Sequence, residues 1–352
     1  MKAMQRILLA VLFLTAVLPM GIAIAEDQAV TPTTEEVQLE PGFSTVLYEG
    51  DYDLDAYLAQ GGASSDAQVV EFLMRHLMGG GAEGLSFVET AFGCSVLSVT
   101  NAQGEALFGR NFDWQACDAL VVQSVPENGY ASIATVNMSF LDGFSGMLNM
   151  LPPQVRTIAA LYAPLDGMND QGLCVAVNMI QDSAVINQET DKPDITTTTV
   201  IRMLLDKAAS VEEAVALLEQ YDMHSSMGMM VHLAIADAAG NSVVIEYVNN
   251  EMVIIESPVV TNFYLAEGDK NGIGTAQSHT RYDMLVERMA QNPTMEMEDV
   301  RDALDSVSKR NFGEFESTEW SIVFNQHSGE VRYYHREDYT KGYTFQLEIV
   351  SE

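Results

Sequence analysis

The chain has 352 residues and a formal net charge of −33, with 50 acidic against 17 basic side chains. Such a field repels polyanions, so it argues against nucleic acid and anionic membrane surfaces as partners. The hydrophobic content of 47% is ordinary for a globular chain, and the length allows one large domain or two small ones.

The N-terminal segment has the three parts of a secretory signal peptide. Lys2 and Arg6 give it a positive start, residues 7–18 are apolar, and the Ala-Ile-Ala of residues 23–25 is a small-x-small cleavage pattern. A membrane anchor is the alternative, but the apolar run is shorter than the roughly 20 residues that span a bilayer. No later stretch is long and apolar enough to span, and no cysteine follows the run where a lipid could attach. We therefore expect residues 1–25 to be removed from a secreted or periplasmic protein that has no membrane anchor.

An acidic segment, residues 26–93, separates this leader from the first cysteine. Residues 26–49 are polar, contain two prolines and lack periodicity, so we expect a loose arm there. Apolar residues at helical spacing predict a helix over residues 66–78, with Asp66 as its N-cap and the glycines at 79–81 as its end.

From Cys94 the apolar pattern changes to that of strands. Residues 94–100 and 105–112, joined by the turn Asn-Ala-Gln-Gly, predict a β-hairpin. Further strands are expected within residues 131–140, 172–180, 230–248, 251–256, 257–265 and 343–350, and a second hairpin over residues 320–337. Helices are expected at residues 196–210, 211–221 with Ser210 as its cap, 281–292 and 297–308. Strand runs interleaved with helix pairs predict a layered α/β or α+β domain.

The first hairpin carries chemistry at its open end. Facing residues of an antiparallel hairpin lie about 5 Å apart, which places Cys94 opposite residues 109–113 and near Arg110 and Asp113. A cation such as Arg110 lowers the pKa of a thiol and makes it more nucleophilic. Because Arg110 and Asp113 have opposite parity, we expect one of them to lie past the strand end or at a bulge.

A carboxylate beside a thiolate makes sense when it holds another cation. The α-amine of Cys94 is such a group once the Gly93–Cys94 peptide bond has been cut. A free α-amine has a pKa of about 7.7–8.0, which suits a general base at neutral pH. The hairpin therefore indicates a cysteine that supplies both the nucleophile and its base.

Several motifs in a fixed order resemble a family of amide hydrolases. They are Cys94 with the following GRNFDW, then DGMNDQGLCVAVN, HLAIADAAGNSVVIEY, VVTN, SHTRYDML and the closing WSIVFNQHSGEVRYYHRE. From about Cys94 to the C-terminus the chain resembles the N-terminal-nucleophile (Ntn) hydrolases that act on linear amides. These include choloylglycine hydrolases, penicillin V acylases, acid ceramidase-like enzymes and isopenicillin N acyltransferases. The resemblance implies an α+β fold, the four-layer αββα sandwich, over residues 94–352.

The resemblance also implies roles at the hairpin. Cys94 is the nucleophile, Arg110 steadies its thiolate, and Asp113 binds and orients its α-amine.

The other implied roles concern the charge that develops on the substrate. Asn178, at the end of GLCVAVN, and Asn262, in VVTN, help to stabilise the oxyanion, and Arg281 supports the charged centre. Donors of this kind, aimed at a tetrahedral intermediate, are worth roughly 3 kcal/mol each.

The chain departs from the choloylglycine hydrolases in the segment before the cysteine. Those enzymes place the cysteine directly after the initiator methionine, whereas here residues 26–93 precede it. This arrangement is similar to the acyltransferase and ceramidase branches, which cut themselves before the cysteine. Residues 26–93 are then a propeptide or a small α-chain that stays bound, and the apolar helix at 66–78 favours retention.

Other polar residues have simpler interpretations. Asp166 and Asn169 are interpreted as turn residues, and His232 as a satisfied core residue. Cys117 and Cys174 are interpreted as buried free thiols, with a disulfide between them as the alternative.

Residues 137–153 are rich in Met, Phe and Leu. An exposed apolar loop marks a binding site, so this segment is interpreted as part of an acyl-chain pocket or as a buried strand end.

The leading hypothesis is an exported, self-processing amidase that hydrolyses a linear N-acyl amide through a Cys94 thioester. The alternatives are an acyltransferase on the same fold, a papain-like thiol protease that pairs Cys94 with a histidine, and an inactive binding protein. The sequence shows no metal-type spacing and no phosphate loop, so we expect no cofactor and a small-molecule N-acyl amide as partner. The acyl group, the amine and the oligomeric state, a homo-oligomer included, stay open.

Overall fold

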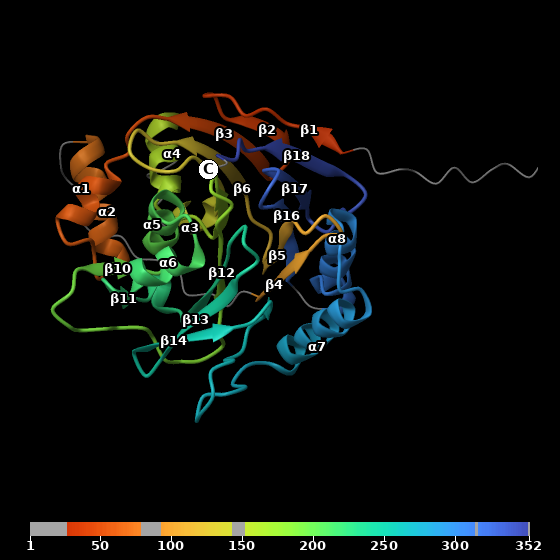
Figure 1. Cartoon of the computed structure of the whole chain (residues 1–352). Helices are drawn as coiled ribbons and strands as arrows, with labels where there is room; N and C mark the ends of the chain where they lie inside the picture. Colours follow the sequence, from red (N-terminus) through yellow and green to blue (C-terminus); the bar gives the residue numbers. More distant parts are fainter. Residues whose placement is uncertain (1–26, 79–92, 143–151, 314–315, 351–352) are drawn as a thin grey trace, which may run out of the picture.

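The computed structural model describes residues 27–78, 93–142, 152–313 and 316–350, so the predicted leader lies outside the described residues. Two large β-sheets lie against each other, and helices cover the outer face of each sheet (Figure 1). Over these ranges no helix has both the length and the apolar character needed to cross a membrane.

One sheet has seven strands and contains the first predicted hairpin. Its strands lie in the order β1 (Gln28–Ala29), β18 (Gly342–Gln346), β17 (Glu330–His335), β16 (Ser317–Asn325), β5 (Ala106–Trp114), β4 (Gly93–Thr100) and β15 (Val259–Val260). α7 (Ala276–Gln291) and α8 (Met297–Ser306) pack on one face of it. α7 begins before the predicted residue 281 because Thr275 caps it, its side chain accepting a hydrogen bond from the backbone N–H of Ser278.

The second sheet has nine strands. Its strands lie in the order β14 (Glu251–Glu256), β13 (Ser242–Val248), β12 (Val231–Ala236), β9 (Cys174–Met179), β8 (Asp166–Asn169), β7 (Ser132–Asn137), β6 (Ala119–Val125), β3 (Phe43–Glu49) and β2 (Val37–Glu40). The helices that pack on it are α4 (Pro153–Leu161), α5 (Thr199–Lys207) and α6 (Val211–Leu218).

Smaller elements complete the described chain. They are α1 (Leu54–Ala59), α2 (Asp66–Met78), α3 (Met138–Asp142), the strand pair β10 (Asp194–Thr196) and β11 (Asp222–His224), and the 3₁₀ turns η2 (Ser226–Gly228) and η3 (Lys309–Asn311).

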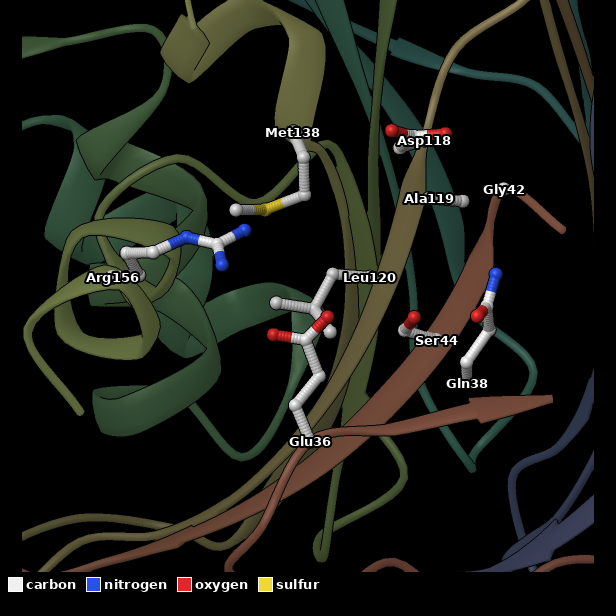
Figure 2. A pocket seen from close by; sticks show the side chains of 9 residues that line it. All are labelled: Glu36, Gln38, Gly42, Ser44, Asp118, Ala119, Leu120, Met138 and Arg156. Atoms are coloured by element: carbon white, nitrogen blue, oxygen red, sulfur yellow. The ribbon is translucent and has the colours of Figure 1, made fainter. Parts of the chain in front are cut away.

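The N-terminal arm is part of both sheets, so the prediction of a loose segment over residues 26–49 was wrong. β3 pairs in parallel with β6 from Phe43 to Glu49, and β1 pairs in parallel with β18. Figure 2 shows Ser44 of β3 on the strand beside Leu120 of β6. The polar composition of the arm suggested a loose segment. The strands β1 and β3 form because they pair with β18 and β6, which lie far away in the sequence.

Most predicted elements after Cys94 are confirmed, with shifted ends. The hairpins are β4–β5 and β16–β17, and the Ser210 side chain caps α6 by accepting from the Glu213 backbone N–H. The strand expected within residues 257–265 is only the two-residue β15, and the one within 131–140 ends at Asn137, where α3 begins.

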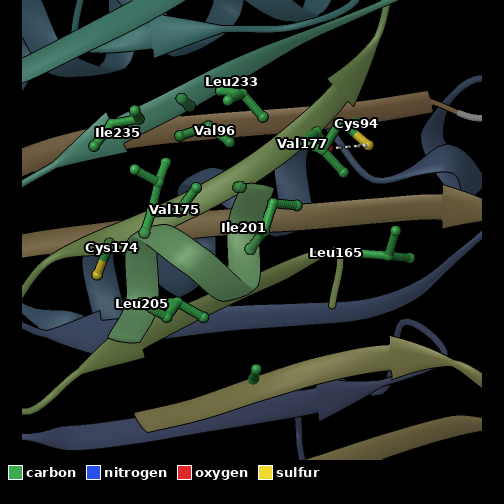
Figure 3. Packing of buried hydrophobic residues seen from close by; sticks show 14 of the residues in the cluster. Cys94, Val96, Leu165, Cys174, Val175, Val177, Ile201, Leu205, Leu233 and Ile235 are labelled. Atoms are coloured by element: carbon green, nitrogen blue, oxygen red, sulfur yellow. Dashed lines mark hydrogen bonds between the residues drawn. The ribbon is translucent and has the colours of Figure 1, made fainter. Parts of the chain in front are cut away.

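The main hydrophobic core lies between the two sheets. β5 is buried along its whole length, and β4 packs against β9 of the other sheet. Figure 3 shows Cys94 and Val96 of β4 near Val175 and Val177 of β9. Helices, two sheets and helices thus form the predicted four-layer αββα sandwich, and the α+β class is confirmed.

Candidate active site

Cys94 is the second residue of β4 and its side chain points between the two sheets. The residue has 0% exposure, and its Sγ lies 3.7 Å from the carbonyl oxygen of Val177 on β9 (Figure 3). Cys94 is paired with Phe112 of β5, and Val96 with Arg110. Since side chains alternate along a strand, Arg110 lies on the same face of the sheet as the thiol.

Arg110 is held by residues of the opposite sheet. Its Nε donates to Asp166 Oδ2 at 2.6 Å, and its Nη1 donates to Asn178 Oδ1 at 2.8 Å. Trp320 Nε1 donates to the same Asp166 oxygen at 2.9 Å. Arg110 and Asp166 both have 0% exposure, so this is a fully buried ion pair that joins the two sheets. Arg110 Nη2 has no nitrogen or oxygen partner among the described residues, and a hydrogen bond between the Arg110 side chain and Cys94 helps to lower the pKa of the thiol.

Asp113 lies on the opposite face of the same strand. It pairs with Gly93, accepts from Arg281 Nη1 at 3.0 Å and from Thr318 Oγ1 at 2.7 Å, and has 0% exposure. The prediction that Arg110 or Asp113 must lie past the strand end or at a bulge was wrong, because both lie within β5 and use its two faces. The register shift lies in the neighbouring strand β16, between Thr318 and Trp320.

Arg281 and Asn262 meet at the backbone of Cys94. Arg281 Nη1 donates to the Cys94 carbonyl oxygen at 2.8 Å and to Ser95 Oγ at 2.8 Å, while its Nη2 donates to Asn262 Oδ1 at 2.6 Å. The backbone N–H of Cys94 donates to the same Asn262 oxygen at 2.8 Å. In the uncut chain this nitrogen is therefore bound by Asn262, and the Asp113 carboxylate is bound by Arg281 and Thr318.

The amide nitrogens of the two predicted oxyanion residues point to backbone carbonyl oxygens. Asn262 Nδ2 donates to the Met179 carbonyl oxygen at 2.7 Å, and Asn178 Nδ2 lies 3.5 Å from the Thr261 carbonyl oxygen. The fold thus brings all of the predicted site residues to one end of the β4–β5 hairpin, from β9, the β15 end and α7.

Burial dominates the electrostatics of the thiol. Desolvation raises the pKa of Cys94 to about 11, although the charges of Arg110 and Arg281 lower it and Asp113 raises it further. Burial also raises the pKa of Asp113, against the opposing charges of Arg281 and Lys309. Arg110 acts in the predicted direction, but in the uncut chain its effect is smaller than that of desolvation.

Asp166 is a site residue that the sequence analysis missed. Its interpretation as a turn residue was wrong, because it begins the buried strand β8 and holds Arg110. Asn169, four residues from Leu173, is the turn residue: its Oδ1 accepts from the Leu173 backbone N–H at 3.0 Å. One signal could have identified it. Asp166 directly follows the apolar Leu165 in a segment that leads into a strand pair, which is an unusual place for an acidic residue without a buried partner.

The remaining predictions concern cysteines, histidine and metals. Cys94, Cys117 and Cys174 are all free and buried, so no disulfide links Cys117 and Cys174. His232 is a satisfied core residue, with Nδ1 3.0 Å from Glu246 Oε1 and Nε2 2.8 Å from the Thr261 carbonyl oxygen. Within the described ranges no group of histidine, cysteine and acidic side chains is placed to hold a metal ion.

A polar pocket lies where the N-terminal strands β2 and β3 meet β6, α3 and α4. Its volume is about 300 Å³, and it is lined by Glu36 of the arm, Ser44, Asp118, Met138 and Arg156 among others. Figure 2 shows Arg156 and Met138 pointing into the same space from the helical side. Of the predicted acyl segment 137–153, residues 143–151 lie outside the described residues, and Met138 lines this pocket.

Comparisons with known proteins bear on the family and on the fold. Residues 94–264 match the family of linear amide C-N hydrolases, choloylglycine hydrolase family. Crystal structures of two variants of a conjugated bile acid hydrolase from Clostridium perfringens are similar, with a TM-score of 0.52 and 16% identity; 74% of this chain covers 98% and 99% of theirs. A penicillin V acylase from Agrobacterium tumefaciens has a TM-score of 0.42 and 15% identity, over 69% of this chain and 83% of the acylase. A search of curated protein sequences gives no match.

Proposed function

We propose that this chain, whose residues 94–264 match the choloylglycine hydrolase family of linear amide C–N hydrolases, uses Cys94 as the nucleophile of an exported, self-processing N-acyl amidase. The observation that carries the proposal is the meeting of Asn262 and Arg281 at the backbone nitrogen and oxygen of Cys94. These contacts are directed at the main chain of one cysteine, which is where a catalytic α-amine would form.

The first proposed step is cleavage of the chain before Cys94. The Cys94 thiol adds to the carbonyl carbon of Gly93, and the C–N bond between Gly93 and Cys94 breaks. The proton lost by the thiol is taken up by the Cys94 nitrogen. The resulting thioester is hydrolysed by water, which releases a Gly93 carboxylate and restores the thiol. Cys94 is left with a free α-amine whose nitrogen already lies 2.8 Å from Asn262 Oδ1.

The same groups then act on the substrate. The α-amine accepts the thiol proton as the sulfur adds to the acyl carbon, and it returns the proton to the leaving amine. Asn178 and Asn262 donate to the oxyanion once their amides turn from the backbone carbonyls that they now bind. Arg110 stabilises the thiolate, and Asp113 with Arg281 fixes the α-amine. Water resolves the thioester.

The segment over residues 26–93 is proposed to stay bound after the cut as a small α-chain. Its strands complete both sheets, so its loss would open an edge of each one. Tyr52 donates a hydrogen bond to Asp206, and Lys207 Nζ lies 2.7 Å from Asp55 Oδ1, which ties the segment to α5. Loss of the segment would also remove Tyr52, Tyr57 and Phe72 and so expose Tyr162, against which all three rings pack.

The competing enzyme class, a papain-like protease, has less support in the site. The charges with the largest effect on the thiol pKa belong to Arg110, Asp113 and Arg281. The ring of His232 is bound by Glu246 and the Thr261 carbonyl oxygen, and it is fully buried.

A substrate screen tests the proposed function. The purified protein and its Cys94→Ala variant are incubated with N-acyl amides, including bile acid conjugates, penicillin V and N-acyl amino acids, and the products are read by mass spectrometry. We expect the native protein to release acid and amine from at least one class and the variant to release none. In a second reaction an amine is added. If the acyl group is then found joined to this amine, the enzyme carries out acyl transfer. Equal turnover by the variant would contradict a Cys94 nucleophile.

A further inference from the structure

Gly93, the residue before the nucleophile, lies where no side chain fits. An ideal Cβ built on it would lie 2.8 Å from Asp113 Oδ2, 2.9 Å from Lys309 Cε and 3.2 Å from Asp113 Cβ. Gly93 and Asp113 are direct cross-strand partners, so their side-chain positions share one face of the sheet. Glycine is needed at position 93 because the side chains of Asp113 and Lys309 approach it closely on that face.

The neighbours that crowd Gly93 are themselves fixed. The Asp113 carboxylate is fully buried and bound on both oxygens, by Arg281 and by Thr318. Lys309 is 4% exposed, and its Nζ lies 2.8 Å from Gln277 Oε1 and 2.9 Å from Glu316 Oε2. A methyl group at position 93 therefore has to displace the main chain, because neither neighbour can move without losing buried hydrogen bonds.

We propose that Gly93 determines the specificity of the self-cleavage step. The side chains of Asp113 and Lys309 leave room at this position for glycine only. This inference rests on the proposed function, because it assumes that the Cys94 thiol attacks the Gly93 carbonyl carbon. Position 93 faces the Asp113 side of β4, and the sulfur of the next residue, Cys94, lies on the other face of the strand. Larger residues at position 93 move the scissile carbonyl away from the sulfur.

The chemistry explains why a small displacement matters. In the cleavage step one C–S bond forms at the Gly93 carbonyl carbon while the C–N bond to Cys94 breaks. A misplacement of about 1 Å in such a reaction costs roughly a hundredfold in rate. Once the bond is cut, position 93 is no longer joined to the nucleophile, so the constraint belongs to the precursor.

The test is the rate of precursor cleavage in position-93 variants. The full-length chain is synthesised in a cell-free system, and the fraction cut at Gly93–Cys94 is followed by mass spectrometry. We expect Gly93→Ala to slow cleavage at least tenfold and Gly93→Val to abolish it. Thr100→Ala, a change at the exposed far end of the same strand, is the matched control and should cleave at the native rate. Cleavage of Gly93→Ala at the native rate overturns the inference.

A double-mutant cycle with Lys309 separates a steric effect from general destabilisation. Lys309→Ala removes one of the two crowding side chains, so the slowing by Gly93→Ala should be at least threefold smaller in the Lys309→Ala background. An equal slowing in both backgrounds overturns the inference, even if both variants are less stable. Cleavage of the Cys94→Ala chain would instead overturn the proposed function, since it would show that another group makes the cut.

Discussion

The Arg110–Asp166 pair is the residue-scale feature that most constrains the site. Both side chains are fully buried, and the guanidinium spans the space between the sheets from β5 to β8 and β9. A buried pair is costly to break, because the remaining charge has neither solvent nor a partner. We therefore expect Asp166 to act on the reaction through Arg110, which it binds.

Asp166→Asn should lower kcat/KM by about a hundredfold, since a guanidinium displaced by about 1 Å no longer faces the sulfur. Steady-state kinetics on the substrate found in the screen measures this. Asp170→Asn is the matched control: Asp170 is a buried acid of the adjacent turn, and its carboxylate accepts from the Ala131 backbone N–H and from Gln171 Nε2. A native kcat/KM in the Asp166→Asn enzyme would show that Asp166 does not position Arg110.

The thiol offers a second residue-scale prediction. In the uncut chain, burial raises the pKa of Cys94 to about 11, while Arg110 and Arg281 lower it. The proposed cut leaves Arg110 and Arg281 in place and adds a free α-ammonium group on Cys94 itself, so we expect the pKa of the thiol to fall. The rate of iodoacetamide alkylation in the cut enzyme should therefore rise with pH to a midpoint below about 8.5, the ordinary value for a free thiol. A midpoint near 11 in the active enzyme would contradict this.

Some residues of the candidate site could be predicted from the sequence and others could not, for physical reasons. Cys94 and Arg110 were accessible because a short turn fixes the hairpin register. The opposite parity of Arg110 and Asp113 was correct, but the expected strand end or bulge was wrong, because Arg281 reaches from α7 to bind both Asp113 and the Cys94 backbone. Asp166 was missed because an Asp-Gly pair is typical of turns, and only the distant guanidinium reveals its role.

At the scale of elements, the contacts of the N-terminal strands support the proposal that residues 26–93 stay bound after cleavage. Glu40 at the end of β2 joins them to the C-terminal hairpin: its Oε2 accepts from Lys341 Nζ at 2.7 Å and Tyr343 Oη at 2.8 Å, and its Oε1 lies 2.5 Å from His335 Nδ1. Burial alone would raise the pKa of Glu40, but these hydrogen bonds lower it to about 2. The Glu40 carboxylate therefore stays charged in the folded protein at pH values well below the ordinary pKa of a glutamate.

Glu40→Gln should lower the Tm at pH 7 by about 2–5 °C. A depressed carboxylate pKa stabilises the folded state above the ordinary value of 4.5, and this stabilisation is lost as the pH falls toward 2. The difference in Tm between the native protein and the variant should therefore shrink between pH 4.5 and pH 2. Glu49→Gln, at the exposed end of β3, is the control. A Tm difference that does not change over this pH range would contradict the role given to Glu40.

Local elements were easier to predict than their pairing. Ser210 marked the start of α6 correctly because N-cap chemistry is local. The parallel pairing of β3 with β6 joins Phe43 to Ala119, and nothing in either strand specifies the other. The polar arm therefore resembled a disordered segment although it supplies strands to both sheets.

At the scale of the whole molecule, the sandwich divides the site between its layers. The seven-stranded sheet carries Cys94, Arg110 and Asp113, and the nine-stranded sheet supplies Asp166 and Asn178. α7 adds Arg281 from the outer layer. The layered class followed from the alternation of strand and helix patterns, whereas the sheet orders depend on contacts across the whole chain that a single sequence does not encode locally.

The most direct test of the account is the N-terminal residue of the large chain in an active preparation, read by mass spectrometry or Edman degradation. We predict a large chain that begins at Cys94, accompanied by a co-purifying small chain that ends at Gly93. A fully active enzyme in which the Gly93–Cys94 peptide bond is intact would contradict the account, because the amine that serves as the base would then not exist.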